Sequence, residues 1–395
     1  MNGSPIDPKI VGCVIVKDEQ RFLADCLTSM RQFCDEIVVV DTGSRDRTPD
    51  IARAHADRVS SYPFSGNFSD ARNHALDLVD GADWVLFLDA DERIHPRQAE
   101  ALRSTLGAAD AGVGGISMLR YNFFPSGGFY SGNVLKLFRA DPRIRYERRV
   151  NESVKGSLAR AGYKVADSPA LLTHIGHMRS RVERDRKAEL YMRLMREQLA
   201  AAPDDAILTG YIGLNLRILG RFSEALDLSA QALAIDDGNA TVWAFRGHVL
   251  RSTGETSEAR QAYARALELR PSDGGMQNMI GCCEASAGRL DEADELFAAA
   301  FRTDPRLVHT VLNRGLVAQA RGDFPTAEAR LLEAAGLFPP LLTEDPVGRM
   351  ETDPLHTLYF ETMTGYAGLA HHLAYVRGCR EGWLSPIRVS ARAED

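Results

Sequence analysis

The sequence predicts an α/β domain with a parallel sheet, followed by an all-α domain made of repeats. Short β-branched runs alternate with helical stretches up to about residue 110, and the strands stop after about residue 180. Beyond that point, glycines recur at a fixed step of 34 residues. The length of 395 residues allows two or three domains, and 45% apolar with 26% charged residues exclude disorder over most of the chain.

The α/β prediction depends on three apolar runs of strand length. Each run is continuous and lacks the period of a helix, which is typical of a strand buried on both faces. The runs are CVIV at 13–16, EIVVV at 36–40 and WVLFL at 84–88. The helical stretches are 19–33, 46–56 and 68–80. This alternation predicts a parallel sheet covered by helices, and residues 111–175 are interpreted as the end of this domain, with short mixed strands and acceptor-side loops.

Small residues share one register in the second half of the chain. The 34-residue step separates Gly220, Gly254, Gly288 and Gly322, and also Gly213, Gly247, Gly281 and Gly315. A helix–turn–helix period of this length is the tetratricopeptide signature, and the small residues mark where paired helices approach closely. We expect a first domain over 1–180 and four repeats with an N-terminal capping helix over 181–340. Residues 341–395 are expected to form a helical cap or a dimer segment, with an apolar helix at 355–378.

Charge and cysteine usage exclude several classes of protein. The formal charge of −7 and the pI near 5.9 leave no basic surplus for binding nucleic acid. The first residues do not resemble a secretory signal, and the apolar runs are too short to span a membrane. The six cysteines form no CxxC pair, so we expect small buried side chains in a reducing cytoplasm rather than a zinc or disulfide framework.

Acidic residues directly follow two of the predicted strands. Asp41 comes after EIVVV, and Asp89 and Asp91 come after WVLFL. Ligands of open α/β sheets bind along this carboxyl edge. For Asp41 a helix cap or a turn is an equally good interpretation. Two carboxylates two residues apart repel each other unless a positive group lies beside them, and a divalent cation with oxygen ligands meets that need.

The sequence is similar to family 2 glycosyltransferases with the GT-A fold. The similarity is carried by VKDEQRFLADCLTSM, DEIVVVDTGSRDRTPDIA, FSDARNHAL and DWVLFLDADE, in that order. More specifically, it resembles the branch that joins this domain to C-terminal tetratricopeptide repeats, to which S-glycosyltransferases of bacteriocin peptides belong. The resemblance implies a Rossmann-like nucleotide-sugar domain. It is specific for the sugar donor and says little about the acceptor.

The resemblance also implies roles for individual donor-site residues. Asp41 and Thr42 match positions that line the uridine pocket. Arg72 matches an arginine near the uracil and the diphosphate, and Asp89 matches a residue that contacts the ribose or the sugar. The opening motif departs from the family, because Asp18 stands where asparagine is usual. This exchange adds a negative charge near the diphosphate.

The remaining implied roles concern the metal and the base. Asp91 matches a ligand of Mn²⁺ or Mg²⁺, and His174 in LLTHIGHMRS matches a second ligand, with His177 as a supporting residue. Glu152 in VNESV matches the general base of an inverting enzyme. Asn151 precedes it where the family usually has histidine, which affects how the base is oriented.

Taken together, these patterns predict a metal-dependent, inverting hexosyltransferase with a nucleotide-diphosphate-sugar donor, UDP-linked in the preferred interpretation. The acceptor is expected to be a peptide or a small natural product, held by the extended surface of the repeats, which could also form a homodimer. The alternative is a tetratricopeptide scaffold with an inactive transferase-like domain. The identity of the sugar and of the attacked atom (oxygen, sulfur or nitrogen) stays open.

Overall fold

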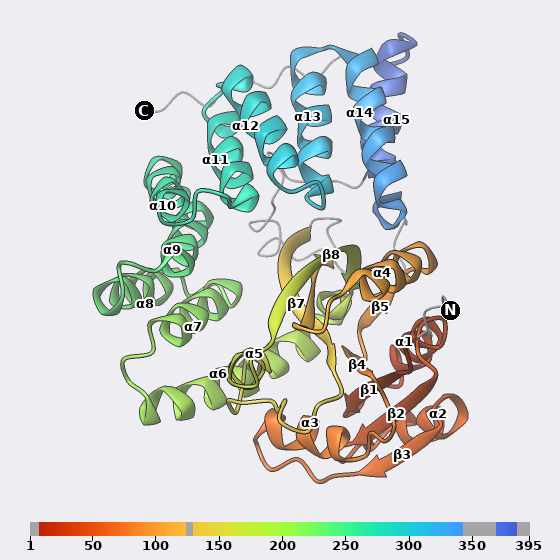
Figure 1. Ribbon diagram of the computed structural model, residues 1–395. Coiled ribbons are helices and arrows are strands. Elements are labelled where there is room, and N and C mark those ends of the chain that lie inside the picture. Colours follow the sequence, from red (N-terminus) through yellow and green to blue (C-terminus); the bar gives the residue numbers. More distant parts are fainter. Residues whose placement is uncertain (1–7, 124–128, 343–368, 385–395) are drawn as a thin grey trace. The chain divides into compact units, whose positions relative to one another are not determined.

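The computed structural model describes residues 8–123, 129–342 and 369–384, and they form two compact units. The first unit comprises residues up to Asn122 together with Ser131–Gly176. The second comprises Phe123–Tyr130 and the chain from His177 onward. The first unit is an α/β domain and the second is helical (Figure 1).

The α/β unit is built on one mixed sheet of eight strands. Their order across the sheet is β3-β2-β1-β4-β7-β6-β8-β5. The strands are β1 (Ile10–Val16), β2 (Glu36–Asp41), β3 (Arg58–Ser61), β4 (Trp84–Asp89), β5 (Glu92–Ile94), β6 (Val113–Phe123), β7 (Phe129–Arg139) and β8 (Lys164–His174). The first four strands in this order are parallel, as predicted, whereas β7 runs antiparallel to β4 and β5 antiparallel to β8. The three apolar runs therefore form the centre of the parallel half.

Alternate residues of the central strands enter two separate cores. In β1, Ile10 and Val14 face one core, while Val11 and Cys13 face the other. Such burial on both faces explains why the runs are continuously apolar. The helices that cover the sheet are α1 (Leu23–Arg31), α2 (Thr48–His55), α3 (Phe68–Asp77), α4 (Pro96–Ala108) and α5 (Lys155–Arg160). Gly12 lets α1 approach closely, because a Cβ there would lie 2.6 Å from Met30 Cε.

The first three helices lie inside the predicted helical stretches. The sequence patterns did not identify α4, α5 or the short strands β3 and β5. The strands β6, β7 and β8 are longer than the short mixed strands expected between 111 and 175, since each has eleven residues. These three strands complete the second half of the sheet, which carries several residues of the candidate site.

The helical unit contains four antiparallel helix pairs in the region of the 34-residue period. They follow α6 (Arg181–Ala201) and are α7 (Ala206–Ile218) with α8 (Phe222–Ile235), α9 (Ala240–Thr253) with α10 (Thr256–Leu269), α11 (Gly274–Ser286) with α12 (Leu290–Thr303), and α13 (Val308–Arg321) with α14 (Phe324–Leu337). The recurring glycines Gly254 and Gly322 end α9 and α13 in the left-handed conformation. Gly247 and Gly281 lie against Tyr263 and Phe297 of the paired helices.

A final helix, α15 (Leu369–Arg380), packs on the last pair. Arg377 and Arg380 form ion pairs with Glu328 of α14, and His372 Nδ1 lies 3.0 Å from Gln319 Oε1 of α13. Part of the expected helix at 355–378 falls outside the described residues. All six cysteines are free thiols, and all except Cys379 are buried. None of the described helices has the length and apolar character needed to cross a bilayer.

Candidate active site

The carboxyl ends of β2 and β4 bring the predicted aspartates to one edge of the sheet. Asp41 pairs in register with Val16 at the end of β1, and Asp89 pairs with Ile15 on the other side of the same strand. The turn after β4 places Asp91 between β4 and β5. The two acidic motifs therefore flank one strand end, as the parallel order of the sheet predicts.

The loop after β2 is held by its own side chains. Ser44 donates hydrogen bonds to the Asp41 carboxylate from its backbone N–H and its hydroxyl. The buried Thr42 donates its hydroxyl to the Val16 carbonyl at 2.9 Å. Asp41 thus makes the turn contacts of the alternative interpretation, and these contacts also shape the edge of the sheet. Its role in a uridine pocket stays a prediction.

The unusual Asp18 has a structural role in the same loop. Its backbone adopts the left-handed conformation (φ 54°), which aspartate tolerates better than most residues. Its carboxylate accepts the Arg45 N–H at 2.7 Å, and its own N–H donates to Ser44 Oγ. An asparagine side chain could accept the same bond through its oxygen. The extra negative charge is therefore tied to the loop after β2 by a backbone donor.

Asp89 is held between two cations. Its Oδ1 accepts from Arg72 Nη2 at 2.7 Å, and its Oδ2 accepts from Lys136 Nζ at 2.8 Å. Burial alone would raise the pKa of this carboxyl, but the charges of Lys136 and Arg72 outweigh burial and hold the pKa well below its usual range. Cys26 contacts the turn after β4, because its Sγ lies 3.4 Å from the Asp89 carbonyl oxygen. The side chain is consequently an ionised carboxylate in a fixed position.

Arg72 connects Asp89 to the predicted base. Its side chain is only 8% exposed and lies 4.7 Å from the ring of Phe87 and 5.2 Å from that of Tyr146, measured from the guanidinium carbon. Its Nε donates to Glu152 Oε1 at 2.7 Å. Burial would lower the pKa of the guanidinium, but the carboxylates of Asp89 and Glu152 reverse that effect and raise it. Arg72 therefore orients two carboxylates at once.

Glu152 lies in a tight loop with a strained backbone. Arg148 (φ 79°) and Asn151 (φ 52°) both adopt left-handed conformations. Asparagine accepts this conformation more readily than histidine's bulkier ring. The loop is closed by a bridge between Glu147 and Ser153. The N-terminus of α3 fixes it, because Ser69 Oγ donates to the Arg148 carbonyl. Strain of this kind concentrates at functional sites and fits a carboxylate held for chemistry.

The pairing of β5 with β8 brings Asp91 next to His174. Glu92 and His174 are paired in register, and the Ile175 N–H donates to the Asp91 carbonyl at 2.9 Å. As a result, His174 Nε2 lies 3.4 Å from Asp91 Oδ1. Gly176 leaves space in front of both, since a Cβ there would lie 2.4 Å from Asp91 Oδ2 and 2.6 Å from His174 Nε2. The two predicted ligands therefore converge on a position that only glycine leaves open.

The donor set fits a divalent cation that also binds substrate. A carboxylate oxygen and an imidazole nitrogen suit Mn²⁺, which accepts both kinds of ligand. Among the residues that the structure describes, no third His, Cys, Asp or Glu joins the pair. A two-ligand protein site leaves the remaining positions to water and to the phosphates of a donor, as is usual for nucleotide-bound cations. His177 belongs to the second unit, where its Nε2 lies 3.4 Å from Tyr130 Oη, and its supporting role stays a prediction.

Three charged residues of the site escaped the sequence analysis. Lys136 on β7 contacts both Asp89 and Glu92, and Arg120 on β6 contacts Glu92. Glu92 is fully buried. A signal was present for the lysine, because it interrupts the apolar strand segment VLKLF. A charged residue in a buried strand requires a partner, but the sequence does not say which one.

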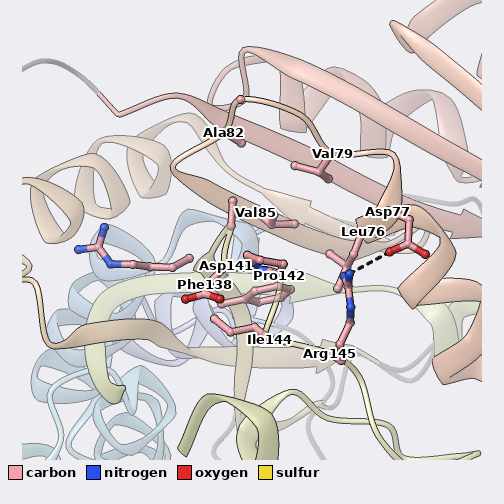
Figure 2. Close-up of a pocket in the computed structure, with 13 residues that line it drawn as sticks. Leu76, Asp77, Val79, Ala82, Val85, Phe138, Asp141, Pro142, Ile144 and Arg145 are labelled. Atoms are coloured by element: carbon pink, nitrogen blue, oxygen red, sulfur yellow. Dashed lines mark ion pairs between the residues drawn. The ribbon is translucent and has the colours of Figure 1, made fainter. Parts of the chain in front are cut away.

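A separate cleft of about 260 Å³ lies at the opposite end of β4 (Figure 2). Its apolar walls include Val85 and Phe138, and at its rim Arg145 forms an ion pair with Asp77 at 2.9 Å. Asp141 is paired with Arg143. Because its acidic side chains are matched by neighbouring arginines and it lies away from the carboxyl edge, we do not assign the chemistry to it.

Comparisons with known proteins find relatives of both parts of the chain. Residues 13–163 match the model of the family described as Glycosyl transferase family 2, and residues 216–280 match a model described as Tetratricopeptide repeat. The chain is 35% identical over 207 residues to the TPR repeat-containing protein Synpcc7942_0270 of Synechococcus elongatus, a match covering 51% of this chain and 50% of that protein.

Several relatives are named as glycosyltransferases, among them proteins of Rhizobium meliloti and Bacillus subtilis. The chain is 28% identical over 151 residues to the lipopolysaccharide core biosynthesis glycosyltransferase LpsC of Rhizobium meliloti, covering 36% of this chain and 55% of that one. It is 22% identical over 222 residues to the SPbeta prophage-derived glycosyltransferase SunS of Bacillus subtilis, covering 56% and 52%. The chain spans about half the length of the curated relatives it matches.

Proposed function

We propose that the chain, which matches the family 2 glycosyltransferase model over residues 13–163 and a tetratricopeptide model over 216–280, transfers a hexose from a UDP-linked sugar to a peptide or small natural-product acceptor. The observation that supports this proposal most strongly is the geometry at the carboxyl edge of the sheet. Asp89, Arg72 and Glu152 form one chain of contacts there, beside the pair of Asp91 and His174.

In the proposed reaction, the acceptor attacks the anomeric carbon in line with the departing diphosphate, and the configuration inverts. Glu152 takes the proton from the acceptor as the new bond forms. Arg72 and the strained loop hold the carboxylate in one orientation, which lowers the entropy cost of reaching the transition state. Asp89, fixed by Lys136, is the residue proposed to contact the ribose or the sugar.

Asp91 and His174 are the residues proposed to hold Mn²⁺ or Mg²⁺. The space that Gly176 leaves beside their ligand atoms supports this assignment. When bound, the cation would neutralise the negative charge that grows on the diphosphate as it leaves. The chain's own contribution is to keep a buried carboxylate and a partly exposed imidazole close together.

The acceptor is proposed to be an extended molecule that the repeats can hold, because tetratricopeptide arrays build long concave surfaces. The resemblance to the branch that modifies bacteriocin peptides favours a peptide. A scaffold with an inactive domain is the alternative function. The buried charges of the site argue against it, since unused buried ion pairs cost desolvation energy without a compensating role.

A binding and turnover experiment tests the proposed function. We expect UDP with Mn²⁺ to raise the unfolding temperature, because a ligand that binds only the folded state adds about 2.7 kcal/mol at a hundredfold excess over its Kd. A panel of nucleotide sugars should then give UDP release that increases with peptide acceptors. A scaffold would show neither the shift nor turnover with any donor.

A further inference from the structure

Lys136 is a buried cation that lies between two carboxylates. Its Nζ is 2.8 Å from Asp89 Oδ2 and 2.8 Å from Glu92 Oε2, and its side chain is 10% exposed. It lies on β7, next to Asp89's strand β4 in the sheet. An ammonium group in such surroundings loses most of its hydration, so the two ion pairs must offset that cost. The placement therefore indicates a specific task rather than an incidental surface contact.

One of the two carboxylates is anchored independently of Lys136. Glu92 Oε1 accepts from Arg120 Nη1 at 2.9 Å, and Glu92 Oε2 accepts the backbone N–H of Asp89 at 2.9 Å. Glu92 is thus fixed from the side of β6 and by the turn itself. Lys136 holds the Asp89 side chain in place relative to Glu92, because its ammonium group contacts both carboxylates.

The other oxygen of Asp89 continues the chain of contacts to the base. Asp89 Oδ1 accepts from Arg72 Nη2, and Arg72 Nε donates to Glu152 Oε1. Arg72 Nη1 is a buried donor, and it has no acceptor among the described residues. With Lys136 in place, Asp89 Oδ2 is bound by the lysine. The Arg72 guanidinium therefore binds Asp89 through Nη2 and Glu152 through Nε.

Removing Lys136 would change this division. Asp89 Oδ2 would lose its partner. Arg72 Nη1 is a buried donor on the guanidinium whose Nη2 already binds Asp89 Oδ1, so it can replace the lysine. Arginine and a carboxylate readily form two parallel hydrogen bonds. Arg72 would then turn toward Asp89 and its Nε would leave Glu152.

We propose that Lys136 is a positioning residue of the transfer reaction, which holds Asp89 so that Arg72 presents Glu152 to the acceptor. Lys136 acts through two other residues and is not itself in contact with the acceptor. This inference rests on the proposed function. Its specific consequence is that loss of Lys136 harms the step that needs the base more than any other step.

The test compares two acceptors in the wild-type protein, in Lys136→Met and in a control variant. An alcohol acceptor needs the base, whereas a thiol acceptor above about pH 8.5 is already ionised. We expect Lys136→Met to lower kcat with the alcohol by about 10- to 100-fold, which is a partial loss of the 10²–10⁴-fold that a general base contributes, and by less than about threefold with the thiol. A purely structural effect, or a weaker donor site, would lower both rates alike. Equal losses with the two acceptors would overturn the proposal.

Arg139→Met is the matched control, because Arg139 is another cation of β7 and its guanidinium contacts the Val113 carbonyl and the Trp84 ring rather than Asp89 or Glu92. We expect its ratio of alcohol to thiol rates to stay at the wild-type value. Lys136→Arg restores the charge and should recover most of the ratio. If Lys136→Met does not fold, Lys136→Met combined with Glu92→Gln keeps the charges balanced and should show the same selective loss. A ratio as low in Arg139→Met as in Lys136→Met would contradict the proposal.

A stability measurement separates this inference from the proposed function. If the wild-type protein transfers no sugar to either acceptor, the proposed function fails. The chain of contacts is then judged by the unfolding temperatures of Lys136→Met, Glu152→Gln and the double variant. Coupled residues give a double loss smaller than the sum by at least about 2 °C. Additive losses, as expected for Arg139→Met combined with Glu152→Gln, would reject the connection between Lys136 and Glu152.

Discussion

The α/β unit and the helical unit differ in how far along the sequence their polar contacts reach. In the α/β unit, Arg72 contacts Glu152, which is 80 residues away, and Lys136 contacts Asp89, which is 47 away. In the helix pairs, Asn313 binds Asn278 at a separation of 35, about one repeat. Contacts between residues far apart in the sequence bring several elements together in one site. Contacts between adjacent repeats only join each repeat to its neighbours.

This difference predicts how damage spreads through each unit. A buried charge removed from the α/β unit leaves partners on several elements without compensation. A side chain changed in one repeat disturbs that repeat and its neighbours. Each of the following experiments tests one side of this comparison.

We expect the largest effect from Arg72→Met. It leaves Asp89, whose side chain is 32% exposed, and Glu152, 12% exposed, without their shared cation, while Asp89 keeps its ion pair with Lys136. We therefore expect a destabilisation of up to about 3 kcal/mol, the lower end for a broken buried ion pair, and loss of transfer. Hydrogen exchange should accelerate in peptides from β4 and α3 but not in those from α9 to α14. The control Arg221→Met removes an exposed partner of Glu224 and should leave exchange unchanged. Unaltered protection of β4 would show that the ion pairs do not support the sheet.

Loss of the metal or of its ligand should nearly match that effect on the rate. Asp91→Asn replaces a charged hard ligand by a neutral amide, so we expect transfer to fall by about 10²-fold or more while the fold is kept. EDTA should have the same effect on the wild-type protein, and Mn²⁺ or Mg²⁺ should reverse it. Asp77→Asn, at the opposite end of the sheet, serves as the control. Full transfer by Asp91→Asn in excess EDTA would remove the metal from the proposed reaction.

Glu152→Gln tests the base directly. General-base assistance contributes about 10²–10⁴-fold, so kcat with an alcohol acceptor should fall by that factor while UDP binding stays nearly unchanged. With a thiol acceptor above about pH 8.5 the loss should be much smaller. Glu147→Gln is the matched control, because Glu147 lies in the same loop and pairs with Arg160. A loss of tenfold or less with the alcohol would assign the base to another residue.

Gly247→Ala probes the helical unit with a smaller expected effect. A Cβ at this position would lie 2.4 Å from Tyr263 Cε1, so the ring must move from its contact with His248. We expect a loss of about 1–3 kcal/mol, with faster hydrogen exchange in α9, α10 and their neighbours and unchanged UDP binding. Gly336→Ala, where a Cβ has open space, should instead stabilise α14 slightly. Faster exchange in β1 or β4 would contradict a local effect.

Lowering the pH should destabilise the two units to different extents, and this is the smallest of the expected effects. Burial lowers the pKa of His248 and His309 to about 3, so their contribution is fully present above the unfolded pKa near 6.5 and is lost as the pH falls. Each of these two histidines should lower the free energy of unfolding of the helical unit by about 1–2 kcal/mol at pH 5.

The corresponding loss in the α/β unit begins at lower pH. The pKa of Asp89 is held below its usual range, so its contribution persists until the pH falls below about 4. Hydrogen exchange at pH 5 corrected for the intrinsic rate should therefore show weakening in α9 and α13 before β4. His309→Leu should reduce the pH dependence. Earlier weakening of β4 would reverse the predicted order.

Periodicity along the sequence determined which elements form. The continuous apolar runs gave the central strands β1, β2 and β4, and the 34-residue step gave the four helix pairs, because both signals are local and repeat at the spacing of the element. The position of Asp41, Asp89 and Asp91 at one edge followed from the parallel order of those strands. The sequence also offered Arg72, Glu152 and His174 through resemblance alone.

The tertiary structure decided which of these side chains touch. The contact of Arg72 with Glu152, the pairing of β5 with β8 that sets His174 beside Asp91, and the insertion of Lys136 between Asp89 and Glu92 depend on the order of strands in the second half of the sheet. No local pattern specifies that order. A buried charge indicates that it needs a partner, but which partner it meets is fixed only when distant strands pack together and exclude water.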